Sequence, residues 1–217
     1  MATLLARNAD VLVTMDATRR EIPGGGLFAR DGVIEAIGPT SELPETADEI
    51  IDLGGHVALP GLINTHHHFY QNLTRAVPAA QDATLFGWLQ TLYPIWARIG
   101  PDEVRISALV ALAEMALSGC TTSSDHLYIF PNGARLDDEI DAATEIGVRL
   151  HASRGAMSIG ESDGGLPPDS LVEKEPDILA DSQRLIQAHH DPRPGAMIRI
   201  AVAPCSPFSV SRDLMRE

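Results

Sequence analysis

LPGLINTHHHFYQ, residues 59–71, is an apolar segment that ends in three consecutive histidines before two aromatic residues. Side chains of a β-strand alternate between its two faces, so His66 and His68 project to one side and His67 to the other. Two neutral imidazoles on one face can hold a single metal ion. The stretch therefore predicts a metal site at the end of a strand and makes a metal enzyme the first hypothesis.

The composition restricts the partners of the chain. Among its 217 residues, 30 are Asp or Glu and 16 are Lys or Arg, a balance that disfavours binding to a phosphate backbone. Cys120 and Cys205 lack CxxC spacing, which argues against a thiolate zinc site or a disulfide framework and fits a reducing compartment. No segment reads as a membrane span or a secretory signal. We expect a cytoplasmic protein without nucleic-acid or membrane partners.

Residues 1–58 read as short strands separated by turns. Apolar clusters occur at residues 11–13, 27–29 and 33–37. The glycine triplet at 24–26 follows a proline and opens no helix, so it predicts a hairpin turn and disfavours a phosphate-binding loop. This part of the sequence predicts a small β unit.

From residue 57 onward, strands and helices alternate. The pattern predicts strands at residues 57–65, 121–128, 148–156 and 197–203, and helices at 82–98 (interrupted at Pro94), 101–119, 136–146 and 173–189. The first of these strands is almost continuously apolar, as is typical of a strand buried on both faces of a parallel sheet. Four such units predict a (β/α) barrel or a doubly wound sheet, and the lack of a Gly-rich dinucleotide motif favours the barrel.

The length of the chain is short for a complete barrel of this kind. An eight-stranded barrel usually needs about 250 residues, and here the first fifty-odd belong to another unit. Residues 211–217 also read as the opening of a helix. We therefore expect the chain to be the amino-terminal fragment of a longer protein.

The segment PGLINTHHH, residues 60–68, resembles the first-strand signature of the amidohydrolase superfamily, and DGVIEAIG (31–38) and IDLGG (51–55) resemble its β-sandwich lead-in. The similarity extends over essentially the whole chain. It implies an α/β fold in which residues 1–58 form the amino-terminal part of a composite β-sandwich. Residues 59–217 would then form the first half of a (β/α)8, TIM-like barrel. It also implies a homo-oligomer with one divalent metal per subunit, zinc or alternatively iron.

Three further motifs narrow the resemblance to aminohydrolases of heteroaromatic rings. HFYQNLTR (68–75), SRGAMS (153–158) and DGGLPP (163–168) are similar to segments of 8-oxoguanine deaminases and hydroxyatrazine aminohydrolases. The implied reaction is hydrolytic deamination of 8-oxoguanine to urate and ammonia. A triazine (hydroxyatrazine-type) or other heteroaromatic aminohydrolase and a non-catalytic binding module on the same fold remain alternatives.

The resemblance also assigns roles to residues. His66 and His68 are the expected metal ligands, but a catalytic zinc generally takes three protein ligands and a water. Further histidines, a metal-binding aspartate and the acid–base glutamate are expected beyond Glu217, so no acid–base catalyst is expected within the chain. Asp125 is a candidate for orienting a neighbouring group through hydrogen bonds.

Three residues are candidate substrate contacts. The amide of Gln71 can pair with the edge of a base, Arg154 can hold a carbonyl oxygen, and Trp88 can stack on a planar ring. Each also has an ordinary structural alternative: a loop hydrogen bond for Gln71, a salt bridge for Arg154, and a core or lid position for Trp88.

Overall fold

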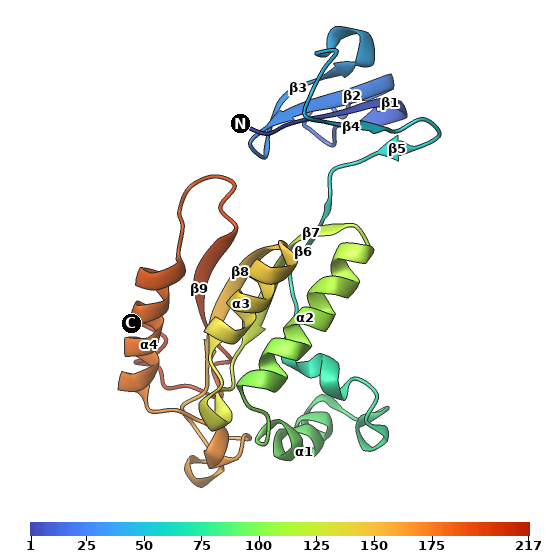
Figure 1. Ribbon diagram of the computed structural model, residues 1–217. Coiled ribbons are helices and arrows are strands. Elements are labelled where there is room, and N and C mark those ends of the chain that lie inside the picture. The colour runs from blue at the N-terminus through green and yellow to red at the C-terminus, as the bar shows by residue number, and fades with distance from the viewer. The chain divides into compact units, whose positions relative to one another are not determined.

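The computed structural model describes residues 1–217 and divides them into two compact units, Met1–Gly61 and Leu62–Glu217 (Figure 1). In the first unit, β1 (Thr3–Val13) is the central strand. It pairs antiparallel with β2 (Glu21–Arg30), which pairs with β3 (Val33–Pro39). Two short strands, β4 (Glu49–Asp52) and β5 (Val57–Ala58), run parallel to β1. The small core contains Leu5, Phe28 and Leu43.

The glycine triplet does not form the predicted turn. Residues 24–26 lie inside β2, and the chain reverses at residues 14–20 instead. The pairing of β1 with β2 shifts register between Ala6 and Ala9, and Gly24 has a φ of 58°. A Cβ atom on Gly26 would lie 2.5 Å from the carbonyl oxygen of Ala6. Glycine is therefore needed here because the backbones of β1 and β2 approach closely at an irregularity of the sheet.

The second unit is built on a parallel sheet. Its order is β6 (Leu62–Asn64), β7 (Cys120–Leu127), β8 (Arg149–Ala156) and β9 (Ile198–Pro204). Helices α2 (Pro101–Leu117), α3 (Leu136–Ile146) and α4 (Glu175–His189) pack against β7, β8 and β9, and α1 (Leu85–Trp96) lies near the carboxyl ends of the strands (Figure 1). The predicted α/β class with a parallel sheet is confirmed.

The prediction of one continuous strand over residues 57–65 is wrong. This stretch consists of β5, which belongs to the first unit, and β6, which belongs to the second. Pro60 has no N–H to donate to a neighbouring strand, and here the chain leaves the sheet of the first unit and continues to that of the second. Because β6 is an outer strand of its sheet, Leu62 and Ile63 are 63% and 68% exposed, not buried on both faces.

Local signals set the helix boundaries. Pro101 begins α2, and Glu103 accepts a hydrogen bond from the N–H of Gly100 as a cap. Gly147, at a φ of 78°, ends α3. Pro94 lies in the last turn of α1, so the helix continues past it to Trp96. None of the helices is long and apolar enough to cross a membrane.

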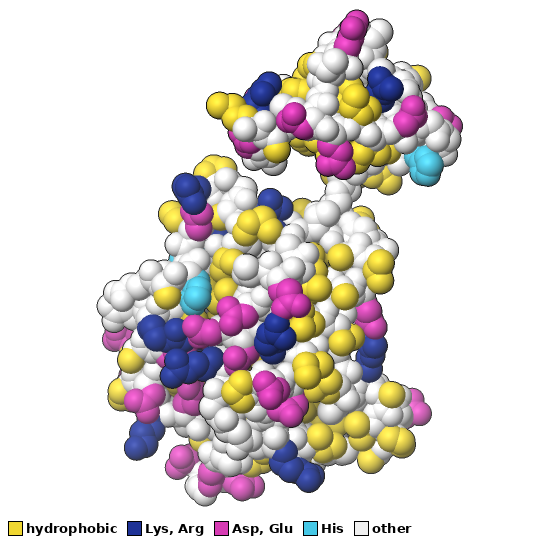
Figure 2. Space-filling model, viewed as in Figure 1, with side chains coloured by type: hydrophobic (Ala, Val, Ile, Leu, Met, Phe, Trp, Pro, Cys, Tyr) yellow, Lys and Arg dark blue, Asp and Glu magenta, His cyan; other side chains and the backbone are white.

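Acidic and basic side chains intermingle over the face that carries α3 and α4 (Figure 2). Arg184 of α4 pairs with Asp137 of α3 and with Asp181 one turn earlier. His189 also contacts Asp137, with 3.1 Å between Nε2 and Oδ1. This face is therefore neither a basic nor an acidic patch but a network of ion pairs that links two helices.

Candidate metal and substrate site

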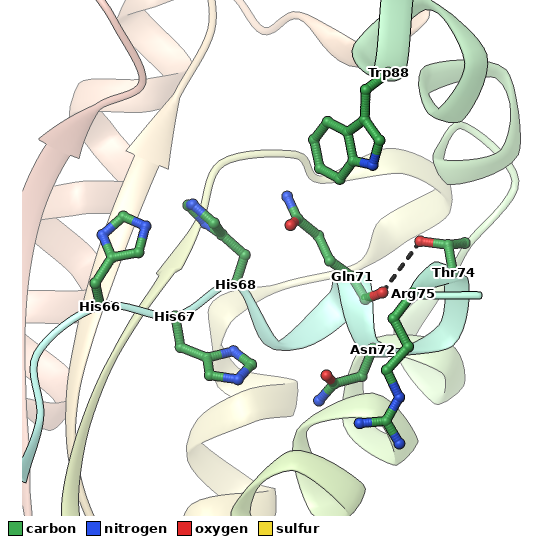
Figure 3. Close-up of a pocket in the computed structure, with 8 residues that line it drawn as sticks. All are labelled: His66, His67, His68, Gln71, Asn72, Thr74, Arg75 and Trp88. Atoms are coloured by element: carbon green, nitrogen blue, oxygen red, sulfur yellow. Dashed lines mark hydrogen bonds between the residues drawn. The ribbon is translucent and has the colours of Figure 1, made fainter. Parts of the chain in front are cut away.

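The three histidines lie on the loop that follows β6. The rings of His66 and His68 point to one side of the loop and His67 points to the other (Figure 3). The centroids of the His66 and His68 rings are 4.9 Å apart, in an edge-to-face arrangement. The alternation expected of a strand thus persists beyond Asn64, the last residue of β6. The structure brings together the two predicted ligands.

The hydrogen bonding of His68 fits a metal ligand. Its Nδ1 lies 2.8 Å from the carbonyl oxygen of His126, which can only accept, so Nδ1 carries the proton. The lone pair is then on Nε2, the atom that a metal would bind. Burial lowers the pKa of the His68 imidazole and favours the neutral form that ligation requires. Two histidines oriented in this way fit a divalent cation such as zinc.

Residues 1–217 supply only part of a metal site. They contain no group of three or more His, Cys, Asp or Glu side chains placed to hold an ion. His126 is near His68, with 5.3 Å between ring centroids, but its Nε2 is hydrogen-bonded to the carbonyl oxygen of Ala203 at 2.8 Å. A backbone carbonyl group therefore already engages the His126 ring.

A cavity of about 730 Å³ lies beside the two histidines. Its walls are largely apolar and aromatic, and they come from β7, α1, the loop at residues 164–167 and the segment after β9; the main lining side chains are Leu85, Phe86, Trp88, Leu89, Tyr93, Tyr128, Leu166, Cys205 and Phe208. A smaller cavity of about 390 Å³ adjoins the histidine loop and is lined by Gln71 and Trp88 as well (Figure 3). The larger volume suits a small aromatic ligand.

Gln71 lines both cavities, and two tyrosines orient its amide. Its Nε2 donates to the hydroxyl of Tyr70 at 3.1 Å and lies 3.4 Å from that of Tyr128. Burial raises the pKa of Tyr128 to about 12 and that of Tyr70 well above its usual value, so both stay protonated. With its nitrogen engaged, Gln71 has its amide oxygen free as an acceptor.

Trp88 projects from α1 toward Gln71 (Figure 3) and lines both cavities. Its indole is half-buried and packs edge-to-face on Trp96, with 5.2 Å between centroids. Trp96 is fully buried and donates to Thr74 at 3.0 Å. A rigid aromatic base therefore supports Trp88 while one of its faces remains open to a ligand.

Arg154 does not join the other predicted substrate contacts. It lines neither cavity. Its buried guanidinium donates to Glu173 at 2.7 and 2.9 Å, to Asp181 at 3.2 Å and to the carbonyl oxygen of Gly155 at 2.7 Å. It also lies 4.2 Å from the centroid of the Phe130 ring. Four of the five N–H groups of Arg154 are thus used within the protein, which corresponds to the salt-bridge alternative.

Sequence reasoning missed several of the wall residues. Tyr128 could have been found, because it follows His126 by two residues and therefore shares its face at the end of β7. Phe86 and Phe208 gave no signal, since they reach the cavity only through the arrangement of distant segments. Cys205 and Ser206, which directly follow β9, also line the cavity.

Comparison with known proteins identifies the family of the chain. Residues 57–217 match the amidohydrolase family. The chain belongs to this family, and its parallel sheet is the first part of the family's barrel.

Proteins similar to this chain include aminohydrolases and related hydrolases. The chain is 49% identical to 8-oxoguanine deaminase from Pseudomonas aeruginosa, over 88% of this chain and 43% of the relative. It is 38% identical to hydroxydechloroatrazine ethylaminohydrolase from a Pseudomonas species, over 95% of this chain and 46% of the relative. The structure of atrazine chlorohydrolase from Arthrobacter aurescens complexed with zinc superposes with a TM-score of 0.88 at 33% identity, covering 97% of this chain and 48% of that one. The chain thus spans less than half the length of these relatives.

Proposed function

We propose that the full-length protein is a metal-dependent aminohydrolase that converts 8-oxoguanine to urate and ammonia. The observation that carries the proposal is the pair His66 and His68, oriented as ligands at the edge of an aromatic cavity, in a chain 49% identical to an 8-oxoguanine deaminase. We also propose one metal per subunit, zinc first and iron second, and a homo-oligomeric assembly.

His66 and His68 would hold the ion, which when bound would lower the pKa of a water and so supply a nucleophile for hydrolysis. The residues of this chain bind and orient the base. Trp88 covers its face, the apolar walls contact its ring, and the Gln71 oxygen accepts an N–H from its edge. Deamination needs a group that passes a proton to the departing amine, and we place that group outside residues 1–217.

A hydroxyatrazine-type substrate is the second candidate. Two observations favour it: the 38% identity to an ethylaminohydrolase and the exposed apolar side chains of Leu85, Phe86 and Phe208 at the cavity. These side chains offer the apolar contact that an alkyl substituent would need, whereas an oxidised purine has no such substituent.

The test is hydrolysis by the purified, zinc-loaded full-length protein of 8-oxoguanine and cytosine, followed by ammonia release, and of hydroxyatrazine, followed by ethylamine release. Urate formed from 8-oxoguanine is also followed by its absorbance. We expect turnover of 8-oxoguanine with the highest kcat/KM. Turnover of hydroxyatrazine alone would establish the second candidate. Binding of zinc without release of ammonia or ethylamine from any of the three compounds would favour a non-catalytic binding module. Metal analysis and light scattering of the same preparation give the metal content and the oligomeric state.

Replacement of Gln71 tests its part in this proposal. Gln71→Leu removes the acceptor, and we expect KM for the base to rise about tenfold, because one hydrogen bond in a dry site is worth about 1–1.5 kcal/mol. Zinc content should not change, since Gln71 is no ligand. Gln90→Leu, at an exposed position of α1, is the control. An unchanged KM in Gln71→Leu would show that its amide serves only the tyrosines.

A further inference from the structure

Two buried carboxyl groups lie on the other side of β7 from the cavity. Asp125 of β7 and Glu139 of α3 both have 0% exposure. Oδ1 of Asp125 accepts the N–H of Phe69 at 2.6 Å. Oδ2 of Asp125 and both oxygens of Glu139 receive no hydrogen bond from any N–H or hydroxyl group. Two charged carboxylates in this position would be strongly unfavourable.

A proton on Glu139 resolves this arrangement. Burial raises the pKa of both carboxyl groups, and the neighbouring Asp125 raises that of Glu139 further. The two carboxyl groups interact with each other, and no N–H or hydroxyl group donates to Glu139. A single proton shared by the pair lets Glu139 donate to Asp125, while Oδ1 of Asp125 still accepts the N–H of Phe69.

The pair holds the backbone that carries His68. Phe69 follows His68 directly, and its carbonyl oxygen accepts a hydrogen bond from Ser107 Oγ of α2, while Asp125 holds its N–H. His126, next to Asp125, donates its N–H to the carbonyl oxygen of His67 at 2.9 Å and accepts from His68 Nδ1. The main chain around His68 is therefore fixed from both β7 and α2.

We propose that Asp125, held in place by Glu139, is a positioning residue for the metal site: it fixes the peptide that follows His68 and so directs the His68 ring toward the ion. Neither carboxyl group touches the metal or the substrate. The inference rests on the proposed role of His66 and His68 as ligands. Groups that orient metal ligands from the next layer typically contribute 10–100-fold to metal affinity.

The test measures zinc affinity of the full-length protein by competition with a chromophoric chelator, together with the visible absorption spectrum of the cobalt-substituted protein. We expect Asp125→Ala to weaken zinc binding about 10–100-fold and to alter the cobalt bands, because the His68 ring is no longer held. Asp125→Asn keeps an acceptor for Phe69 and should restore most of the affinity. Glu139→Gln keeps a donor to Asp125 and should bind zinc nearly as the parent does. Asp141→Asn, exposed on the same helix, is the control.

Zinc affinity and a cobalt spectrum that are both unchanged in Asp125→Ala would overturn the inference, even if the variant melts at a lower temperature. Should Asp125→Ala not fold, Ser107→Ala removes the other hydrogen bond to Phe69; weaker zinc binding supports the inference and unchanged binding overturns it. The parent and His68→Ala are measured in parallel. If His68→Ala binds zinc as tightly as the parent, His68 is not a ligand, and both the proposed metal site and the inference fail. If the parent binds zinc through His68 and Asp125→Ala binds it with the same affinity, only the inference is rejected.

Discussion

Arg154 shows what a buried charge requires at the scale of one residue. Its side chain is 1% exposed, while those of its partners Glu173 and Asp181 are 25% and 28% exposed. The carboxylates keep part of their hydration, and the guanidinium, which has lost its own, uses them to satisfy its donors. Arg154 therefore links the end of β8 to α4 and to the segment before it.

Arg154→Met separates this structural role from substrate binding. We expect a loss of roughly 3 kcal/mol in the free energy of unfolding, because the two carboxylates lose a buried partner. KM for the base should stay close to that of the parent. Denaturant unfolding and steady-state kinetics of the full-length protein measure the two quantities. Arg193→Met, which breaks an exposed pair with Asp191, is the control and should leave stability unchanged. A large rise in KM with little loss of stability would restore Arg154 as a substrate contact.

At the scale of elements, the close approach of the β2 backbone to that of β1 explains why β2 contains three consecutive glycines. Gly26 pairs with Gly38 of β3, so two glycines lie side by side in very different surroundings. A Cβ atom on Gly26 would meet the Ala6 oxygen at 2.5 Å, whereas a Cβ atom on Gly38 meets only the mobile end of Glu42 at 3.6 Å. One position requires glycine and its neighbour does not.

We expect Gly26→Ala to destabilise the first unit by about 1–3 kcal/mol, because backbone atoms cannot move away from the new methyl group without disturbing the pairing of β1 and β2. Gly38→Ala should be neutral or slightly stabilising. Denaturant unfolding with a probe in the first unit checks both variants. Equal effects would indicate that the β1–β2 contact adjusts without cost.

The contact between α3 and α4 should depend on pH. Hydrogen bonds from Arg184 to both oxygens of Asp137 hold the pKa of this carboxyl far below its usual value. A carboxyl group whose pKa is lowered by folding contributes stability above its unfolded pKa, about 4, and loses that contribution as the pH falls through the folded value. We expect Asp137→Asn to be less stable than the parent at pH 7, with the difference shrinking at pH 3 and below. Asp141→Asn serves as the control in the same unfolding series. A difference that is the same at both pH values would argue against this ion pair.

At the scale of the whole molecule, the sequence predicts those features that depend on neighbouring residues in the chain, such as helix ends and the facing of nearby side chains. Pro101, Gly119 and Gly147 mark helix ends, and the spacing of His66 and His68 places two imidazoles on one side. The cavity walls and the partners of Arg154 depend on segments that meet only after folding, and no local pattern encodes them. The limits of β6 were missed because it takes only three residues from a longer apolar run.

The parallel sheet of the second unit has two outer strands, β6 and β9, whose outward backbone groups find no strand partner within residues 1–217. Apolar side chains accompany them: Ile63 is 68% exposed and Val202 is 58% exposed. Unpaired strand edges with exposed apolar side chains favour pairing between molecules. We therefore expect residues 1–217, prepared as an isolated polypeptide, to self-associate and to be inactive, since they provide only two metal ligands.

Light scattering after size-exclusion chromatography tests this expectation, with the full-length protein as reference. Ile63→Lys places a charge on the β6 edge and should reduce the association of the isolated polypeptide. Ile106→Lys changes an exposed apolar residue of α2 and leaves both sheet edges as they are, so it should have no such effect. A monodisperse, active monomer of residues 1–217 would contradict both the edge argument and the assignment of the remaining catalytic groups to residues outside this chain.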